Sequence, residues 1–170
     1  MSCFTRSLSV LTLGLVGLGL SASEFTPLAS ELHATWPSKH RIGVVCNAAE
    51  QQQALAVLSQ AMGPEAKLLV VDTRSSIELG TAVSGLRSHQ VDFVVLLPSD
   101  RMFGEGSPLR AELTRNLANF GIPCVGITAK SIQDGAFFAV GSDTRNCARI
   151  HTQPMGNIKA ELPVNCMPGM

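Results

Sequence analysis

The sequence predicts an α/β fold of three layers, in which a mainly parallel five-stranded sheet carries helices on both faces. Three observations predict it. Several short segments are apolar throughout instead of alternating, which indicates strands buried on both sides. Segments of helical period separate most of these strands and would cover the two faces. The length of 170 residues is typical of one domain, so a single sheet with right-handed crossovers is expected.

The first half of this domain is predicted to contain two strands and the helices that follow them. Residues 41–46 (RIGVVC) form the first strand, and the apolar spacing over 48–62 predicts a helix that ends at a Gly-Pro pair. Residues 67–72 (KLLVVD) form the second strand. The next helix is expected to begin with Ser76 as its N-cap and an acidic residue in its first turn.

The second half contains three further strands. Residues 91–97 (VDFVVLL) are the most uniformly apolar of them. A helix over 107–120 follows, with Ser107 as N-cap, a proline at its first position and a glycine after its end. Residues 123–128 form the fourth strand, and 135–142 form the fifth after a short connection.

The two ends of the chain differ in pattern from this domain. Residues 1–23 have a basic start, an apolar run and small residues at a cleavage position, as in a secretory signal peptide. The alternative, a membrane anchor, needs about 20 apolar residues, and this run is shorter. We therefore expect a periplasmic or secreted protein. Residues 24–40 show no sustained period and read as a leader, 41–145 form the α/β lobe, and 146–170 form a C-terminal extension.

Composition excludes some classes of partner and cofactor. Lys and Arg number 13 and Asp and Glu also 13, so no basic surplus exists to bind nucleic acid. The glycines of residues 103–110 (FGEGSPLR) precede a helix and could cradle an anion, but they do not match a phosphate-binding motif. A flexible loop is the preferred interpretation, and no cofactor is predicted.

The cysteines fall into two groups. Cys46 and Cys124 lie in predicted strands, where we expect small buried apolar residues. Cys147 and Cys166 lie in the irregular C-terminal part, where an exported chain could join them in a disulfide. Their spacings are not those of a metal site, so no metal is predicted.

Catalytic groupings are missing from the sequence. No G-x-S-x-G elbow is present, and none of the four histidines falls at the end of a predicted strand. A reactive thiol would need a neighbouring cation or helix N-terminus, and Cys46 lies within its strand. The sequence therefore predicts a protein that is not an enzyme.

Candidate ligand-binding residues follow from the expected sheet. In an open parallel sheet, ligands bind beyond the carboxyl ends of the strands. Asn47 follows the first strand, Ser99 and Asp100 follow the third, and Asp143 follows the fifth. Two interpretations of Asp100 stay open: it binds a ligand, or it only ends a buried strand by accepting hydrogen bonds from free backbone amides.

Four segments in order also carry a family resemblance. "HRIGVVCNAAEQQQALAVLSQA", "VDFVVLLPSD", "GIPCVGIT" and "GAFFAVGSD" together resemble the C-terminal lobe of tryptophan/tyrosine-type substrate-binding proteins of ABC transporters, a periplasmic-binding-protein-like class. The resemblance covers about residues 40–145. It implies that Asn47, Ser99, Asp100 and Asp143 line a cleft for an amino-acid-like solute, with the Asp100 carboxylate as an acceptor for an ammonium group.

The chain has room for one lobe, whereas the family has two. A closed site would therefore need a second wall from a second copy of the chain or from a partner such as an ABC permease or a sensor domain. We expect an exported solute-binding protein related to ABC transport. The alternative is a cell-envelope protein-interaction module that keeps the lobe without binding a small molecule.

Overall fold

The fold contains one parallel sheet, as predicted. The computed structural model of the chain describes residues 22–140. Its sheet has five strands in the order β2-β1-β3-β4-β5, and all four pairings are parallel. The strands are β1 Arg41–Cys46, β2 Lys67–Asp72, β3 Phe93–Leu96, β4 Cys124–Gly126 and β5 Phe138–Ala139.

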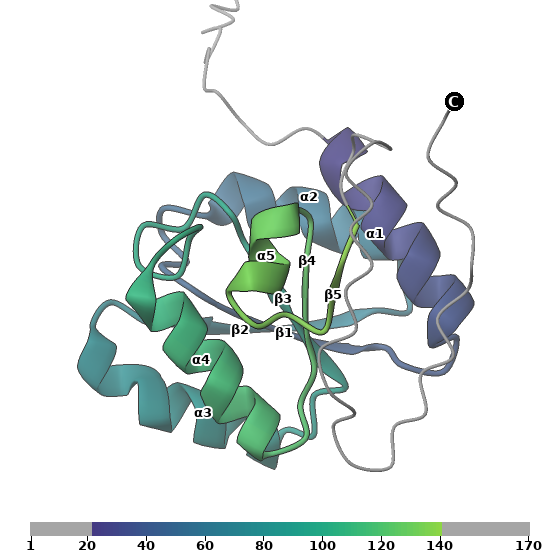
Figure 1. Cartoon of the computed structure of the whole chain (residues 1–170). Coiled ribbons are helices and arrows are strands. Elements are labelled where there is room, and N and C mark those ends of the chain that lie inside the picture. The colour runs from purple at the N-terminus through teal and green to yellow at the C-terminus, as the bar shows by residue number, and fades with distance from the viewer. Residues whose placement is uncertain (1–21, 141–170) are drawn as a thin grey trace, which may run out of the picture.

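Helices cover both faces of this sheet, which confirms the three-layer architecture. Figure 1 shows α1 and α2 on one side of the sheet and α3 and α4 on the other. Among the described residues, no helix is both long and apolar enough to cross a membrane. The helices are α1 Ala22–Thr35, α2 Gln52–Met62, the 3₁₀ turn η1 Ser76–Glu78, α3 Leu79–Ser88, α4 Pro108–Asn119 and α5 Ala129–Gln133.

Each face of the sheet has its own apolar core, because successive side chains of a strand point to opposite faces. In β3, Phe93 and Val95 pack with α1 and α2, whereas Val94 and Leu96 pack with α3 and α4. All four are buried. This two-sided burial explains why the strand reads as a continuous apolar run.

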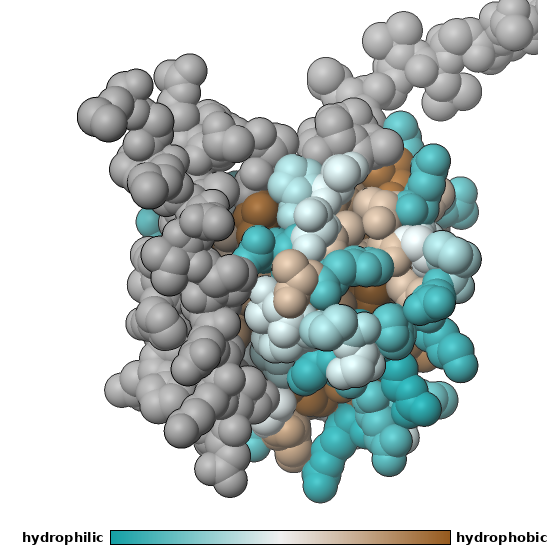
Figure 2. Space-filling model, turned by 90° about the vertical axis from the view of Figure 1, so that its right-hand side faces the viewer, coloured by the Kyte–Doolittle hydropathy of each residue, from teal (hydrophilic) through white to brown (hydrophobic). Residues whose placement is uncertain are grey.

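Residues 24–40 correct the sequence interpretation, since most of the predicted leader is helical. Within α1, Phe25, Leu28 and Leu32 are buried, and Trp36 just beyond it is also buried. Their spacing is helical, but Pro27 inside the helix obscured it. Figure 2, which faces the right-hand side of Figure 1, shows hydrophilic side chains spread over the outer surface there with smaller apolar areas between them.

Replacing a buried residue of α1 tests whether this helix belongs to the folded domain. Leu28 is fully buried, so Leu28→Ala should lower the free energy of unfolding by about 2 to 4 kcal/mol through lost burial and a residual cavity. Urea denaturation followed by circular dichroism measures the change. Ser30→Ala, on the exposed side of the same helix, is the control and should change stability by less than about 0.5 kcal/mol. Equal, small effects of both variants would contradict the packing of α1.

Helix ends were predicted with mixed success. The N-cap of α4 is confirmed: the Ser107 hydroxyl accepts a hydrogen bond from the Leu109 amide, and Gly121 after the helix has a φ of 70°. The prediction of Ser76 as an N-cap is wrong, because Ser76 already lies inside η1. The side chain of Glu78, the last residue of η1, accepts a hydrogen bond from the Arg74 amide before the turn.

Two connections also differ from the prediction. The helix predicted from residue 48 begins at Gln52, because the Asn47 carbonyl accepts hydrogen bonds from the amides of Glu50 and Gln51 and closes a turn there. The connection before the fifth strand holds the short helix α5, which was not predicted. Both differences lie at the carboxyl edge of the sheet.

Candidate functional site

Asp100 occupies the centre of the carboxyl edge. Its side chain is buried, with 4% of the residue exposed. One carboxylate oxygen accepts the Asn47 amide at 3.0 Å, and the other accepts the amides of Met102 and Phe103 at 2.9 and 2.7 Å. The carboxylate therefore joins the loop after β1 to the turn after β3, and three backbone donors occupy it.

Gly104 allows this turn to close on Asp100. A Cβ atom at Gly104 would lie 2.1 Å from the Asp100 carbonyl oxygen and 2.8 Å from that of Pro98. Both neighbours are backbone atoms, so a side chain at this position would displace the turn. The first glycine of the glycine-rich loop thus has a packing role.

Ser99 and Gln51 tie the same two loops together a second time. The Ser99 hydroxyl donates to the Gln51 side-chain oxygen at 3.0 Å, and the Gln51 side-chain nitrogen donates to the Ser99 carbonyl at 3.2 Å. Beside them, the Oδ1 atom of Asn47 is buried and has no hydrogen-bond partner among the described residues. A buried amide oxygen without a partner is costly, and a donor that reached it would satisfy it.

The neighbouring end of β2 holds an exposed charged pair. The Asp72 carboxylate accepts the Ala48 amide at 2.9 Å, and its other oxygen lies 3.0 Å from the Arg74 guanidinium. The Ala48 amide is the main cause that lowers the pKa of Asp72 below its ordinary value, and Arg74 adds to it. Asp72 therefore stays ionised and faces solvent.

A buried cation lies at the end of β4. The Arg110 side chain is fully buried; its Nη2 donates to the Ser131 hydroxyl at 2.5 Å, and its Nε lies 3.2 Å from an Asp134 carboxylate oxygen without hydrogen-bond alignment. Burial lowers the pKa of Arg110, and Asp134 opposes that effect. Thr114 also donates to the Asp134 carbonyl at 2.5 Å. This cluster attaches α5 to α4.

The structure brings together three of the predicted ligand-binding residues. Asn47, Ser99 and Asp100 lie within one network of hydrogen bonds. Asp143, Cys147 and Cys166 lie outside the described residues. The assignment of a solute site to this edge and of a disulfide to the two cysteines therefore stays a prediction.

Two residues of this edge were missed. Gln51 was placed inside a helix, because the turn that separates it from the strand has no distinctive residues. Arg110 fell inside the predicted helix over 107–120 and was not singled out. A signal for its burial existed, because Arg110, Leu113, Thr114 and Leu117 are buried at the spacing i, i+3, i+4, i+7 of one helical face.

The described cysteines have no activating surroundings. Cys46 and Cys124 are buried and unpaired, as predicted. Burial raises the pKa of each thiol to about 12, with the Asp100 charge as a second cause at Cys46. Both thiols stay protonated at neutral pH, so neither is a nucleophile.

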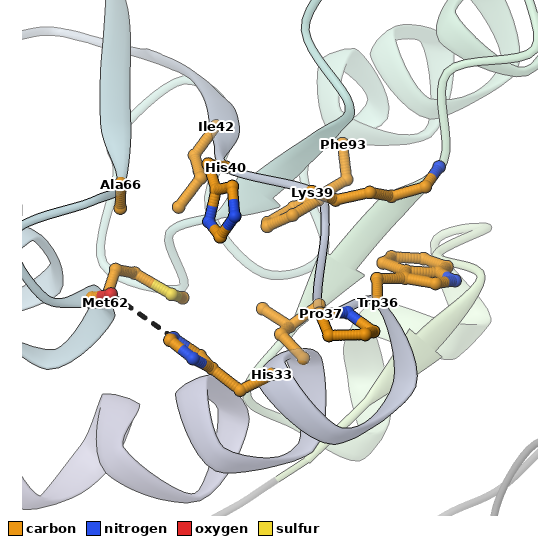
Figure 3. Close-up of a pocket in the computed structure, with 10 residues that line it drawn as sticks. His33, Trp36, Pro37, Lys39, His40, Ile42, Met62, Ala66 and Phe93 are labelled. Carbon is orange, nitrogen blue, oxygen red and sulfur yellow. Dashed lines mark hydrogen bonds between the residues drawn. The ribbon is translucent and has the colours of Figure 1, made fainter.

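The described histidines lie away from this edge. Figure 3 shows His33 and His40 around a small pocket at the amino ends of β1 and β3, where the His33 ring lies 3.3 Å from the Met62 carbonyl oxygen. The pocket encloses about 10 Å³, roughly the room of one water molecule. In residues 22–140, no three His, Cys, Asp or Glu side chains are grouped to hold a metal ion.

Comparisons with known proteins add little to this geometry. No family model matches the chain. No curated protein matches it either. A solved structure from Ralstonia eutropha JMP134, described provisionally as an alcohol dehydrogenase, is similar to 64% of this chain with 22% identity and a TM-score of 0.44. The match spans only 28% of that protein.

Proposed function

We propose that the protein is an exported solute-binding component related to the substrate-binding proteins of ABC transporters, and that it binds a small solute at the carboxyl edge of the sheet. The observation that carries the proposal is the buried, unpartnered Oδ1 atom of Asn47 beside Ser99. The family resemblance supports it independently, because it assigns the same residues to a ligand. A solute with an N–H or ammonium donor fits this acceptor.

The chemistry of the edge favours binding over catalysis. In the described part of the edge, the carboxylates of Asp72 and Asp100 bind loop amides. Beside them lie side-chain amides, hydroxyls, and the guanidiniums of Arg74 and Arg110. The described histidines lie elsewhere, and both described thiols stay protonated. Such groups orient a polar molecule without activating a nucleophile.

A thermal-shift screen of the purified chain tests the proposal. Amino acids, small sugars, nucleosides and organic anions are the panel, and a bound solute should raise Tm with its concentration. Asn47→Ala should remove that shift while leaving the Tm of the free protein within about 2 °C, because the lost oxygen has no partner there. Gln60→Ala, an exposed amide on α2, should keep the shift. A shift that survives Asn47→Ala would place the solute elsewhere.

One observation favours a second candidate, a cell-envelope protein-interaction module. Three backbone amides occupy the Asp100 carboxylate, so the turn after β3 is satisfied without any solute. This function predicts no response to the panel and a stable complex with a protein such as a permease or sensor domain. Light scattering on the purified chain, alone and with candidate partners, separates the two functions.

A further inference from the structure

β2 is the strand of this sheet that its surroundings cover least. It lies at one edge, and the four residues between its ends, Leu68 to Val71, are only partly buried. The inner strands are buried along their lengths apart from Arg41, and β5 at the opposite edge is buried as well. A hollow beside the start of β2 exposes part of Leu68 and Leu69. Among the described residues no strand pairs with the outer side of β2, so apolar side chains reach the surface along this sheet edge.

The backbone of β2 offers hydrogen-bonding groups along this edge. The Lys67 amide donates to the carbonyl oxygen of His40, just before β1, at 2.7 Å. The Thr73 amide donates to the carbonyl oxygen of Cys46, the last residue of β1, at 3.0 Å. The register between them runs without interruption, so residues of odd number face β1. The N–H and C=O groups of Leu68, Val70 and Asp72 consequently point outward.

The usual protections of a sheet edge are missing from β2. It contains no proline, glycine or bulge, and its charges, Lys67 and Asp72, stand only at its two ends. An apolar edge of this kind pairs readily with another strand. The segment KLLVVD thus has the properties of a strand that forms an interface.

We propose that β2 pairs with β2 of a second copy, antiparallel about a two-fold axis at Val70, to give a continuous ten-stranded sheet. This register pairs Val70 with its own equivalent and Leu68 with Asp72, so all three outward residues exchange hydrogen bonds with the partner. It also places Leu69 opposite Val71 in an apolar contact.

The charges at the two ends of β2 favour a second copy as the partner and an antiparallel direction of pairing. An antiparallel copy brings the end of one β2 that carries Lys67 alongside the end of the other that carries Asp72, with the two side chains on opposite faces of the sheet. A parallel copy would place each charge beside its equal, which is unfavourable. The strand is therefore complementary to itself in both polarity and charge.

This pairing is separate from the proposed solute site. Two-fold symmetry about an axis through β2 points the carboxyl edges of the two sheets in opposite directions. The second copy would then leave each candidate site open, and a wall for the solute would have to come from another protein. The interface is thus independent of solute binding and can be tested without a ligand.

Amide hydrogen exchange of the full chain, combined with light scattering, tests the pairing. As the protein concentration rises, the mass should double, and exchange at the amides of Leu68, Val70 and Asp72 should slow at least tenfold. Leu69 and Val71 face β1 and serve as internal controls whose exchange stays slow throughout. A monomer at every concentration, or a dimer whose outward amides stay unprotected, would overturn the proposal.

A pair of variants at one position separates backbone pairing from side-chain loss. Val70→Pro removes an outward N–H and leaves the bonds to β1, so it should weaken the dimer about 30-fold or more through two lost hydrogen bonds. Val70→Ala keeps that N–H and should remain dimeric. Equal dimer strength in both variants would overturn the edge pairing. If Val70→Pro fails to fold, the exchange measurement on the unaltered chain decides the question.

Discussion

Asp100→Ala should lower the free energy of unfolding by about 3 kcal/mol or more. The carboxylate accepts the amides of Asn47, Met102 and Phe103 inside a buried turn. Alanine would leave all three donors without an acceptor, and each buried unsatisfied group carries a penalty. Urea denaturation at neutral pH measures the loss.

Two companions make this result interpretable. Asp100→Asn keeps the shape and one acceptor oxygen, so it should lose less stability than the alanine variant. Arg101→Ala changes the exposed neighbour and should stay within about 0.5 kcal/mol of the unaltered protein. If Asp100→Ala proves as stable as Arg101→Ala, the carboxylate does not hold the turn. Because Asp100→Ala is expected to destabilise the fold, it is unsuitable as a probe of solute binding, and Asn47 is the residue to change for that purpose.

Arg110→Ala should lower the free energy of unfolding by about 3 to 5 kcal/mol, because it leaves the Asp134 carboxylate in a buried place without its cation. It also removes the hydrogen bond to Ser131 and the packing of a fully buried side chain. Arg115, on the exposed side of α4, gives the control. Thermal and urea unfolding of Arg110→Ala and Arg115→Ala should differ clearly.

A double-mutant cycle isolates the ion pair within this cluster. Arg110→Met fills much of the same volume without charge, and Asp134→Asn removes the matching charge. The double variant should be more stable than the sum of the two single losses predicts, by about 1 to 3 kcal/mol of coupling. Additive losses would show that Arg110 acts through packing alone.

The sequence predicted the sheet well because its signals are strong. Strands buried on both faces, such as β1 and β3, need apolar residues at every position, and this pattern is visible without a structure. α1 was not predicted because its few apolar residues are separated by polar ones and by Pro27. Its place in the fold depends on distant packing with α2 and the sheet, and on contacts of Trp36, just beyond its end, with β3 and β5, which a local pattern does not contain.

The candidate site was predictable in position and less so in role. The carboxyl-edge rule selected Asn47, Ser99 and Asp100, which lie together. Whether an acidic side chain at a strand end faces a ligand or its own backbone depends on how the turn closes, and Gly104 sets that closure. Arg110 was missed because a charged residue on a buried helical face is stable only with a partner, and Asp134 comes from a different element.

The position of Trp36 gives the protein a built-in optical reporter. It is the sole tryptophan of a chain without tyrosine, so its fluorescence is free of other strong emitters. Its ring lies 5.7 Å from that of Phe93 and 5.4 Å from that of Phe138, at the meeting of α1, β3 and β5. Three segments far apart in the chain must assemble before this environment exists. A stopped-flow trace of its emission would therefore time the slow, long-range step of folding, while local helix formation leaves the signal unchanged.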